Sequence, residues 1–188
     1  MKASQSEREL PKSSYVILGL LATCGPKTPY ELKKLVDSSI GYFWDFPRAQ
    51  LYVDPERLVT QGYLEEEREA EGRRRRTYHV TPTGLAALRT WLQEPEKTEV
   101  EIRDSGLLKL FFGSLLDRLN LVALAHRERD SHEQRLRQYQ QIKATLLSSP
   151  EDTDQFALAT LEMGLKYEQI SVDFWAEMAT HPPTTPRE

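Results

Sequence analysis

The chain has 188 residues, of which 39% are hydrophobic and 29% charged, and its formal net charge is −4. This balance is typical of a folded globular protein rich in helical surface and argues against a disordered chain. No apolar run approaches the roughly 20 residues that a membrane-spanning helix requires, and residues 1–10 lack the apolar core of a signal peptide. A single cysteine, Cys24, cannot form an internal disulfide. We therefore expect a soluble, cytoplasmic protein with no membrane partner.

The acidic charge is concentrated in the second half of the chain. Residues 11–94 carry 12 Lys and Arg against 11 Asp and Glu, whereas residues 95–188 carry 11 against 16. The first half is nearly neutral and its arginines are clustered. Its local potential can therefore attract a polyanion despite the negative net charge.

The first predicted helix spans residues 15–23, and Ser13 or Ser14 can cap its start. Its nearly continuous apolar residues predict that it is mostly buried, with Cys24 as a small core residue at its end.

A second helix is predicted from Thr28 to about Ser38. Thr28 is the expected N-cap, and Pro29 suits the first helical position. Glu31 stands three residues after Thr28, where the acid of a capping box accepts a hydrogen bond from the backbone N–H of the N-cap.

A third helix is predicted from Arg48 to Thr60, although Pro55 lies inside it. Either this helix continues with a kink, or Asp54 caps a new segment that begins at Pro55. The short length favours one kinked helix. The aromatic loop before it is expected to pack between the second and third helices rather than to form a ligand cage. Its aromatic residues are Tyr42, Phe43, Trp44 and Phe46.

Two strand-like segments, residues 63–67 and 77–80, flank a tip that holds Gly72 and the four consecutive residues Arg73, Arg74, Arg75 and Arg76. A fourth helix follows and runs through Leu92. A hairpin between helices with a cationic tip is typical of the wing of a winged helix-turn-helix, in which arginines bind DNA phosphates and release counterions. A solvated loop balanced by nearby glutamates is the alternative for the tip alone, and the order of elements favours the wing.

The remainder is predicted to be helical, with one helix over residues 101–116, a long helix from its cap Asp117 to about Leu147, and a last helix over residues 154–179. Residues 148–150 are predicted to break the chain between the two long helices. Apolar residues recur in both at steps of three and four, the pattern of a helix–helix seam. We expect this seam to form a dimer through Leu119, Val122, Leu136, Tyr139, Leu158, Leu161, Leu165, Val172 and Trp175.

Polar residues interrupt the middle of this seam. Arg129 and His132 are expected either to fix the helix register or to line an effector cavity between subunits. Tyr139 and Trp175 can wall such a cavity, although seam packing is favoured for both. His126 and His132 lie six residues apart, on different sides of one helix, so together they cannot chelate a metal. No metal and no cofactor are expected.

These elements predict a mainly α fold with a winged helix-turn-helix DNA-binding domain over residues 1–95 and an α-helical dimerisation domain over residues 96–180. A proline-rich tail, residues 181–188, is expected to be disordered. In such a DNA-binding domain the third helix enters the major groove and the second braces it against the backbone.

The motifs of these elements resemble the PadR family of bacterial transcriptional regulators. The resemblance covers nearly all of residues 13–175, and its last motif is typical of members with a long helical C-terminal domain. The motifs are Tyr15-Val16-Ile17-Leu18-Gly19-Leu20-Leu21, Thr28-Pro29-Tyr30-Glu31-Leu32, Gln50-Leu51-Tyr52, Arg57-Leu58, Gly62-Tyr63-Leu64-Glu65, Gly72 to Tyr78, Trp91-Leu92 and Leu108-Lys109-Leu110-Phe111-Phe112-Gly113.

The resemblance implies a homodimer with two wings, a palindromic operator in double-stranded DNA, and repression that a small molecule relieves. Carried onto this sequence, it implies major-groove contacts by Arg48, Gln50 and Tyr52, and wing contacts by Arg73 to Arg76. Pro55 stands where a leucine is more common in the family. In some members a pair of aromatic residues flanks bound drugs, and Trp175 is the only counterpart of that pair in this sequence. The resemblance therefore does not identify the effector, which is expected to be hydrophobic or aromatic.

The chemistry of the side chains agrees with these roles. Arg48 can form two hydrogen bonds to a guanine edge, and Gln50 two to an adenine edge. Lys33 and Lys34 are expected on the exposed side of the second helix, where they can touch phosphate.

Two other classes of function were weighed against a DNA-binding regulator. A protein-interaction module could use a winged-helix scaffold and the acidic C-terminal helices to dock a partner, but it has no need of a cationic hairpin tip. An enzyme is not expected, because the sequence has no glycine-rich phosphate loop, no H-E-x-x-H motif and no nucleophile elbow.

Overall fold

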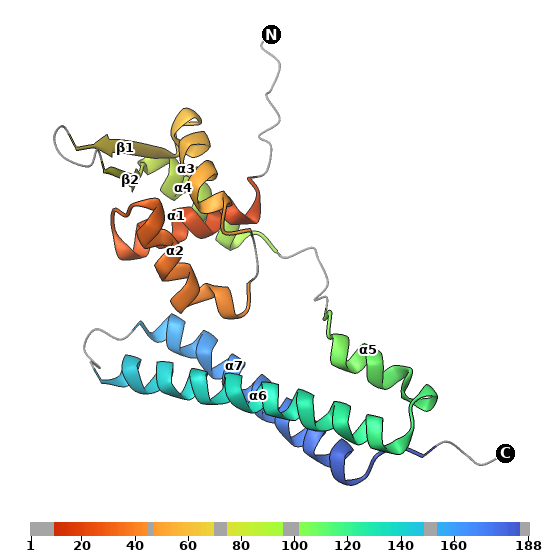
Figure 1. The fold of residues 1–188 in the computed structure, drawn as a ribbon. Coiled ribbons are helices and arrows are strands. Elements are labelled where there is room, and N and C mark those ends of the chain that lie inside the picture. Colours follow the sequence, from red (N-terminus) through yellow and green to blue (C-terminus); the bar gives the residue numbers. More distant parts are fainter. Residues whose placement is uncertain (1–9, 45–46, 70–74, 96–101, 149–153, 185–188) are drawn as a thin grey trace. The chain divides into compact units, whose positions relative to one another are not determined.

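The computed structural model describes residues 10–44, 47–69, 75–95, 102–148 and 154–184, with the backbone alone at residue 42. Its internal contacts divide the chain into two compact units, Met1–Glu99 and Val100–Glu188, which we call unit 1 and unit 2. Figure 1 shows the elements of both in chain order. Among the described helices, none is long and apolar enough to cross a membrane.

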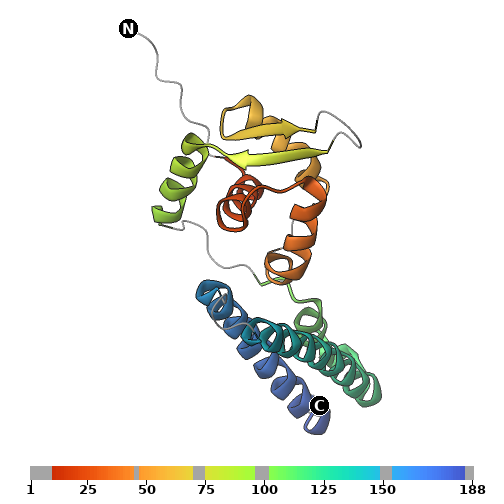
Figure 2. The same cartoon turned by 90° about the vertical axis from the view of Figure 1, so that its left-hand side faces the viewer.

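Unit 1 is a winged helix-turn-helix fold. Its elements are α1 (Lys12–Cys24), α2 (Pro29–Ser38), the 3₁₀ turn η1 (Ile40–Tyr42), α3 (Gln50–Thr60), β1 (Leu64–Arg68), β2 (Arg76–Val80) and α4 (Pro82–Gln93). The two strands pair antiparallel, with Leu64 opposite Val80 and Arg68 opposite Arg76. Lys27 exchanges two backbone hydrogen bonds with Tyr78, which places the segment before α2 at the edge of the hairpin. In Figure 2, α1 is seen end-on, between α2 and α4 and below the hairpin.

The core of unit 1 draws apolar side chains from its helices and its hairpin. Ile17 and Leu18 of α1 are fully buried, which confirms that this helix is mostly buried. Each fully buried aliphatic side chain of this kind contributes about 1.5–3 kcal/mol relative to an exposed one. The core also contains Leu32, Val36, Leu51, Leu58, Leu64, Tyr78 and Leu88.

The start of α2 has the predicted capping box. The Thr28 Oγ1 atom accepts a hydrogen bond from the Glu31 backbone N–H at 3.3 Å, and the Thr28 N–H donates to Glu31 Oε2 at 2.8 Å. The start of α1 differs from the prediction, because the N-cap is Pro11, which makes no side-chain cap. Ser13 and Ser14 lie inside the helix and are buried, since their hydroxyls bind polar groups of α3.

Those polar groups come from the buried face of α3. Ser13 Oγ donates to Asp54 Oδ2 at 2.7 Å, and the Arg57 guanidinium donates to Ser14 Oγ at 2.7 Å and to Asp54 Oδ1 at 3.3 Å. Asp54 therefore pairs with α1 and does not cap a new segment. The helix α3 continues through the buried Pro55 as a single helix, so a second segment beginning there is ruled out.

Two further predictions for unit 1 were wrong. Cys24 is exposed, because it stands at the last turn of α1, past the core. Phe43 and Trp44 are also exposed, with 63% and 36% of their surfaces accessible, and do not form the joint between α2 and α3. Ile40, from the preceding turn, packs against the core in that region instead. The side chains of Tyr42 and Phe46 lie outside the described residues.

The base of the hairpin is tightly joined to α4. Thr81 caps α4 by accepting a hydrogen bond from the Gly84 N–H at 3.0 Å, and its hydroxyl donates to the Gly62 carbonyl at 2.8 Å. A Cβ atom at Gly84 would lie only 2.1 Å from the Tyr63 carbonyl oxygen, so no larger residue fits there without moving the backbone. On the other side of the unit, the rings of Tyr15 and Trp91 stack with centroids 4.5 Å apart and join α1 to α4.

Unit 2 is helical. Its elements are α5 (Ser105–Phe111), the 3₁₀ turn η2 (Gly113–Leu115), α6 (Arg118–Leu147) and α7 (Gln155–Thr180). The predicted helix over residues 101–116 is shorter in the structure, because Asp104 caps α5 by accepting hydrogen bonds from the Gly106 and Leu107 N–H groups. Residue 101 lies outside the described residues. Asp117 caps α6 as predicted, through the Asn120 N–H at 2.8 Å.

The long helices α6 and α7 lie side by side and antiparallel (Figures 1 and 2). Tyr139 and Trp175 of the predicted seam are buried between them, which is the packing role favoured for both. Leu119 is 83% exposed, so it does not belong to the contact between these two helices. The other members of the predicted seam are half-buried: Val122, Leu136, Leu158, Leu161, Leu165 and Val172. Of the predicted break, residues 149 and 150 lie outside the described residues.

Candidate nucleic-acid interface

The outward face of α3 is the first component of the candidate interface. Leu51, Asp54, Pro55 and Leu58 turn inward, so the helical period leaves the opposite face to solvent. That face carries Tyr52, 47% exposed, Val53, 66% exposed, and the exposed Glu56. Gln50 is half-buried at the first residue of the helix.

A second component lies where α2 meets the residues before α3. Arg48 precedes the helix instead of belonging to it, and its Nε donates to Asp37 Oδ1 at 2.8 Å. Lys33 Nζ donates to the other oxygen of Asp37 at 2.6 Å. Hydrogen bonds from Lys33 and Arg48 lower the pKa of Asp37, so the carboxylate stays charged and holds the two cations together. Lys34 points elsewhere, and its ammonium lies 4.7 Å from the centre of the Tyr30 ring.

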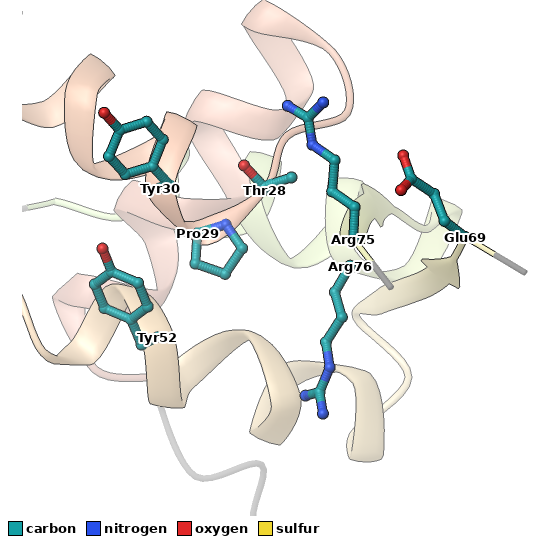
Figure 3. A pocket seen from close by; sticks show the side chains of 7 residues that line it. All are labelled: Thr28, Pro29, Tyr30, Tyr52, Glu69, Arg75 and Arg76. Carbon is teal, nitrogen blue, oxygen red and sulfur yellow. The ribbon is translucent and has the colours of Figure 1, made fainter. Parts of the chain in front are cut away.

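The hairpin supplies the third component. Arg73 and Arg74 lie outside the described residues. Because side chains alternate along a strand, the next two arginines point in opposite directions, Arg75 towards α2 and Arg76 towards α3 (Figure 3). Arg75 Nη2 donates to Glu31 Oε1 at 2.6 Å. Arg76 Nη1 donates to Glu56 Oε1 on α3, and its Nε lies 3.6 Å from Glu66 Oε1 on β1.

These ion pairs shift the titration of the groups involved. The pKa of Arg76 is raised by its hydrogen bonds to Tyr78 and Glu56. The pKa of Glu31 is lowered, first by the hydrogen bonds from Thr28 of the capping box and further by the charge of Arg75. Arg75 and Arg76, the described members of the arginine run, thus each face a carboxylate of the same chain.

An open groove of about 670 Å³ lies between the start of α2, α3 and the hairpin. Figure 3 shows the rings of Tyr30 and Tyr52 on one side of it and the two arginines on the other. Its lining residues are Thr28, Pro29, Tyr30, Tyr52, Glu69, Arg75 and Arg76.

The structure thus brings Tyr52, Arg75 and Arg76 together at one groove, and Arg48 and Lys33 together at Asp37. Tyr30, Val53 and Glu56 also belong to this surface, although they were not among the predicted site residues. Glu56 lies four residues after Tyr52, so the helical period alone could have placed both on one face.

This surface, with its exposed helix and its cationic side chains, has the chemistry that binds double-stranded DNA. Guanidinium, ammonium and tyrosine hydroxyl groups are common donors to DNA phosphates, and an α-helix with an exposed face fits the major groove. Among the described residues, no group of three or more His, Cys, Asp or Glu side chains is placed to hold a metal ion.

The chain is similar to known proteins over most of its length. Residues 17–90 match the family model "Transcriptional regulator PadR-like family", and residues 102–180 match "Virulence activator alpha C-term". The chain is also similar to the curated protein "Negative transcriptional regulator PadR" of Bacillus subtilis (strain 168), with 27% identity over 106 residues. That alignment covers 55% of this chain and 58% of the relative, less than two thirds of its length.

Solved structures share the fold over most of the chain. B. subtilis PadR in complex with operator DNA superposes with a TM-score of 0.82 at 22% identity, covering 91% of this chain and 97% of that one. The complex of B. subtilis PadR with p-coumaric acid gives 0.74 at 23% identity, covering 89% and 93%. A PadR-like transcriptional regulator from Bacillus cereus gives 0.75 at 17% identity, covering 89% and 95%.

Proposed function

This chain belongs to the PadR-like family of transcriptional regulators, and we propose that it is a homodimeric repressor that binds a palindromic operator and is released by a small molecule. The observation that carries the DNA-binding part is the surface where the outward face of α3 meets the groove beside the hairpin. The similar fold of a protein solved with operator DNA supports the same assignment.

The proposed roles divide into base contacts and phosphate contacts. We assign the base contacts to Gln50 and Tyr52 in the first turn of α3 and to Arg48 just before it, because a helix that enters the major groove reads base edges with its N-terminal residues. Arg48 must share its guanidinium between Asp37 and the DNA, since it already donates to that carboxylate. The proposed phosphate contacts are Lys33, Lys34, Arg73, Arg74 and Arg75.

The dimer is proposed from the apolar surface of unit 2. The contact between α6 and α7 leaves a row of large apolar side chains exposed on α5, η2 and the first turn of α6. Clusters of large exposed apolar side chains are uncommon on monomers, and they often mark an association site. Closed homodimers are the commonest oligomers, so we propose that a second copy covers it. The exposed side chains are Leu107, Leu108, Phe111, Phe112, Leu115 and Leu119.

The remaining half-buried seam residues are proposed to extend this interface: Val122, Leu136, Leu158, Leu161, Leu165 and Val172. Twofold symmetry would then present two copies of α3 about 34 Å apart, one turn of the duplex, and the operator would be a palindrome with that spacing.

The effector is proposed to be a small hydrophobic or aromatic compound, because a protein of similar fold is solved with p-coumaric acid. Trp175 and Tyr139 are buried against neighbouring side chains, and the Tyr139 ring lies against Gly164. A ligand that reached these rings would therefore have to separate α6 from α7, which would change the surface offered to the second copy.

The experiment is selection of DNA from a random library by the purified full-length protein, followed by sequencing of the retained fragments. We expect a palindromic motif with half-sites one turn apart, and light scattering should give the mass of a dimer. Addition of hydroxycinnamate-like aromatics should release the selected DNA if the effector class is right. Failure to enrich any sequence would remove the regulator proposal and favour the protein-interaction alternative.

A further inference from the structure

We infer that Arg76 is a positioning residue that holds the hairpin against α3 and masks the negative charge of Glu56, rather than a phosphate contact. This role rests on the proposed DNA-binding function and differs from the phosphate contact that the arginine run indicates. In this role Arg76 acts together with Glu56, its ion-pair partner on the outward face of α3.

The geometry singles Arg76 out among the described wing residues. Its guanidinium bridges two elements, because Nη1 donates to Glu56 on α3 while Nε faces Glu66 on β1. The Glu66 side chain is only 12% exposed and also accepts a hydrogen bond from Arg68 Nε. Arg76 also donates a hydrogen bond to the hydroxyl of Tyr78, which is buried in the core. The guanidinium is thus held by groups from α3 and from both strands.

Arg75 provides the contrast. It is 53% exposed, and it is held by Glu31 Oε1 alone among the interactions described for it. The other oxygen of Glu31 stays in the capping box of α2. Exchange of Glu31 for a DNA phosphate at Arg75 would leave the cap intact. Exchange at Arg76 would release Glu56, which would then face the DNA as an unpaired carboxylate.

The charge of Glu56 decides the role of its partner. The side chain is 59% exposed on the face of α3 that carries Tyr52 and Val53. An unpaired carboxylate on that face repels the phosphates on either side of the major groove, and like charges across an interface suppress binding. With Arg76 in place the pair is neutral, and the hairpin is fixed beside the reading helix.

The test compares the variants R76Q, E56Q and R76Q/E56Q with R75Q as the matched control, each as full-length protein on the DNA selected by the wild type. R76Q alone should bind about tenfold to a hundredfold more weakly, because it leaves Glu56 unpaired. R76Q/E56Q should recover at least tenfold of that loss and keep the wild-type slope of log affinity against log salt. R75Q should make this negative slope shallower by about 0.9, the value for one lost phosphate contact.

The opposite pattern overturns the inference. If Arg76 binds phosphate, R76Q/E56Q stays as weak as R76Q, and for both the negative slope is shallower by about 0.9. Wild-type binding distinguishes this failure from failure of the proposed function, since a wild type that binds no DNA removes the function itself. The charge-exchanged variant R76E/E56R gives a second measurement, and its affinity should exceed that of R76E by at least tenfold.

Discussion

The Nδ1 atom of His132 on α6 lies 2.6 Å from Oε2 of Glu168 on α7, and both side chains are at least 95% buried. Arg135 completes the cluster, since its Nε donates to the other oxygen of Glu168 at 3.1 Å. These groups form a buried polar cluster within the contact between the two long helices. Of Arg129 and His132, which were expected to fix the helix register or to line an effector cavity, His132 is thus the one that contacts the other helix. Arg129 instead pairs with Asp130 and Glu133 of its own helix.

Removal of one member of this cluster should destabilise unit 2 strongly. Glu168→Leu leaves the buried His132 and the Arg135 guanidinium without their acceptor, and loss of one partner of a buried pair costs about 3–5 kcal/mol. The double variant H132L/E168L should cost much less, because both polar groups leave together. Urea unfolding followed by circular dichroism measures both. Equal losses in the single and double variants would show that the pair does not set the register.

Val53 should contribute to the choice of operator. It is an apolar side chain, 66% exposed, on the outward face of α3, and apolar contact with the thymine C5-methyl group is one of the ways in which a reading helix recognises a base. Replacing the contacted thymine by deoxyuridine should weaken wild-type binding by about 0.8 kcal/mol, the value for one buried methylene group. Val53→Ala should bind both DNA molecules equally. A variant that still distinguishes thymine from uracil by the same factor would exclude the contact.

Glu31→Gln should change the response of the protein to acid. Glutamine can still close the capping box, but the ion pair with Arg75 is lost. The pKa of Glu31 is lowered in the folded state, first by the hydrogen bonds from Thr28. Its charge therefore stabilises the fold above the unfolded pKa of about 4.3, and this contribution disappears as pH falls through the lower folded value. At pH 7 the free energy of unfolding of the wild type should exceed that of the variant by less than about 1 kcal/mol, because the ion pair with Arg75 is exposed.

The measurement for this variant is urea unfolding at a series of pH values from 7 to 3. The difference between wild type and variant should shrink towards zero at the acid end of the series. A difference that grows as the pH falls would contradict the sign of the pKa shift.

Truncation after Glu94 should leave a folded monomer that binds DNA weakly. Unit 1 has its own core, whereas the proposed dimer surface belongs to unit 2, so two linked DNA contacts become one. Light scattering and operator binding measure the two effects. If residues 1–94 are still dimeric, the surface of α5 and the seam are not the interface.

Local rules were sufficient for much of the fold. The capping box at Thr28 and the cap Asp117 depend on residues within three positions of one another, so the sequence displays them directly. The hairpin and the extents of the two long helices follow from period and turn residues in the same way.

Contacts between distant residues could not be predicted. Spacing along the chain does not reveal that Ser13 binds Asp54, 41 residues away, which makes it a buried helical residue instead of a cap. Nor does it reveal that Arg76 pairs with Glu56, 20 residues away. Leu119 and Leu121 are both apolar and two positions apart, but only Leu121 is buried. Spacing alone does not decide which of two such residues faces the partner helix, since that depends on how α7 packs.

The contact between Gly84 and the Tyr63 carbonyl has a mechanical consequence. With Thr81 bonded to the chain on both sides of this point, the first turn of α4 and the root of the wing form one stiff joint. A displacement of this turn would be passed directly to the hairpin through Gly62 and Tyr63, while Leu88 ties the rest of α4 to the core. The base of the hairpin should therefore follow any movement of the first turn of α4.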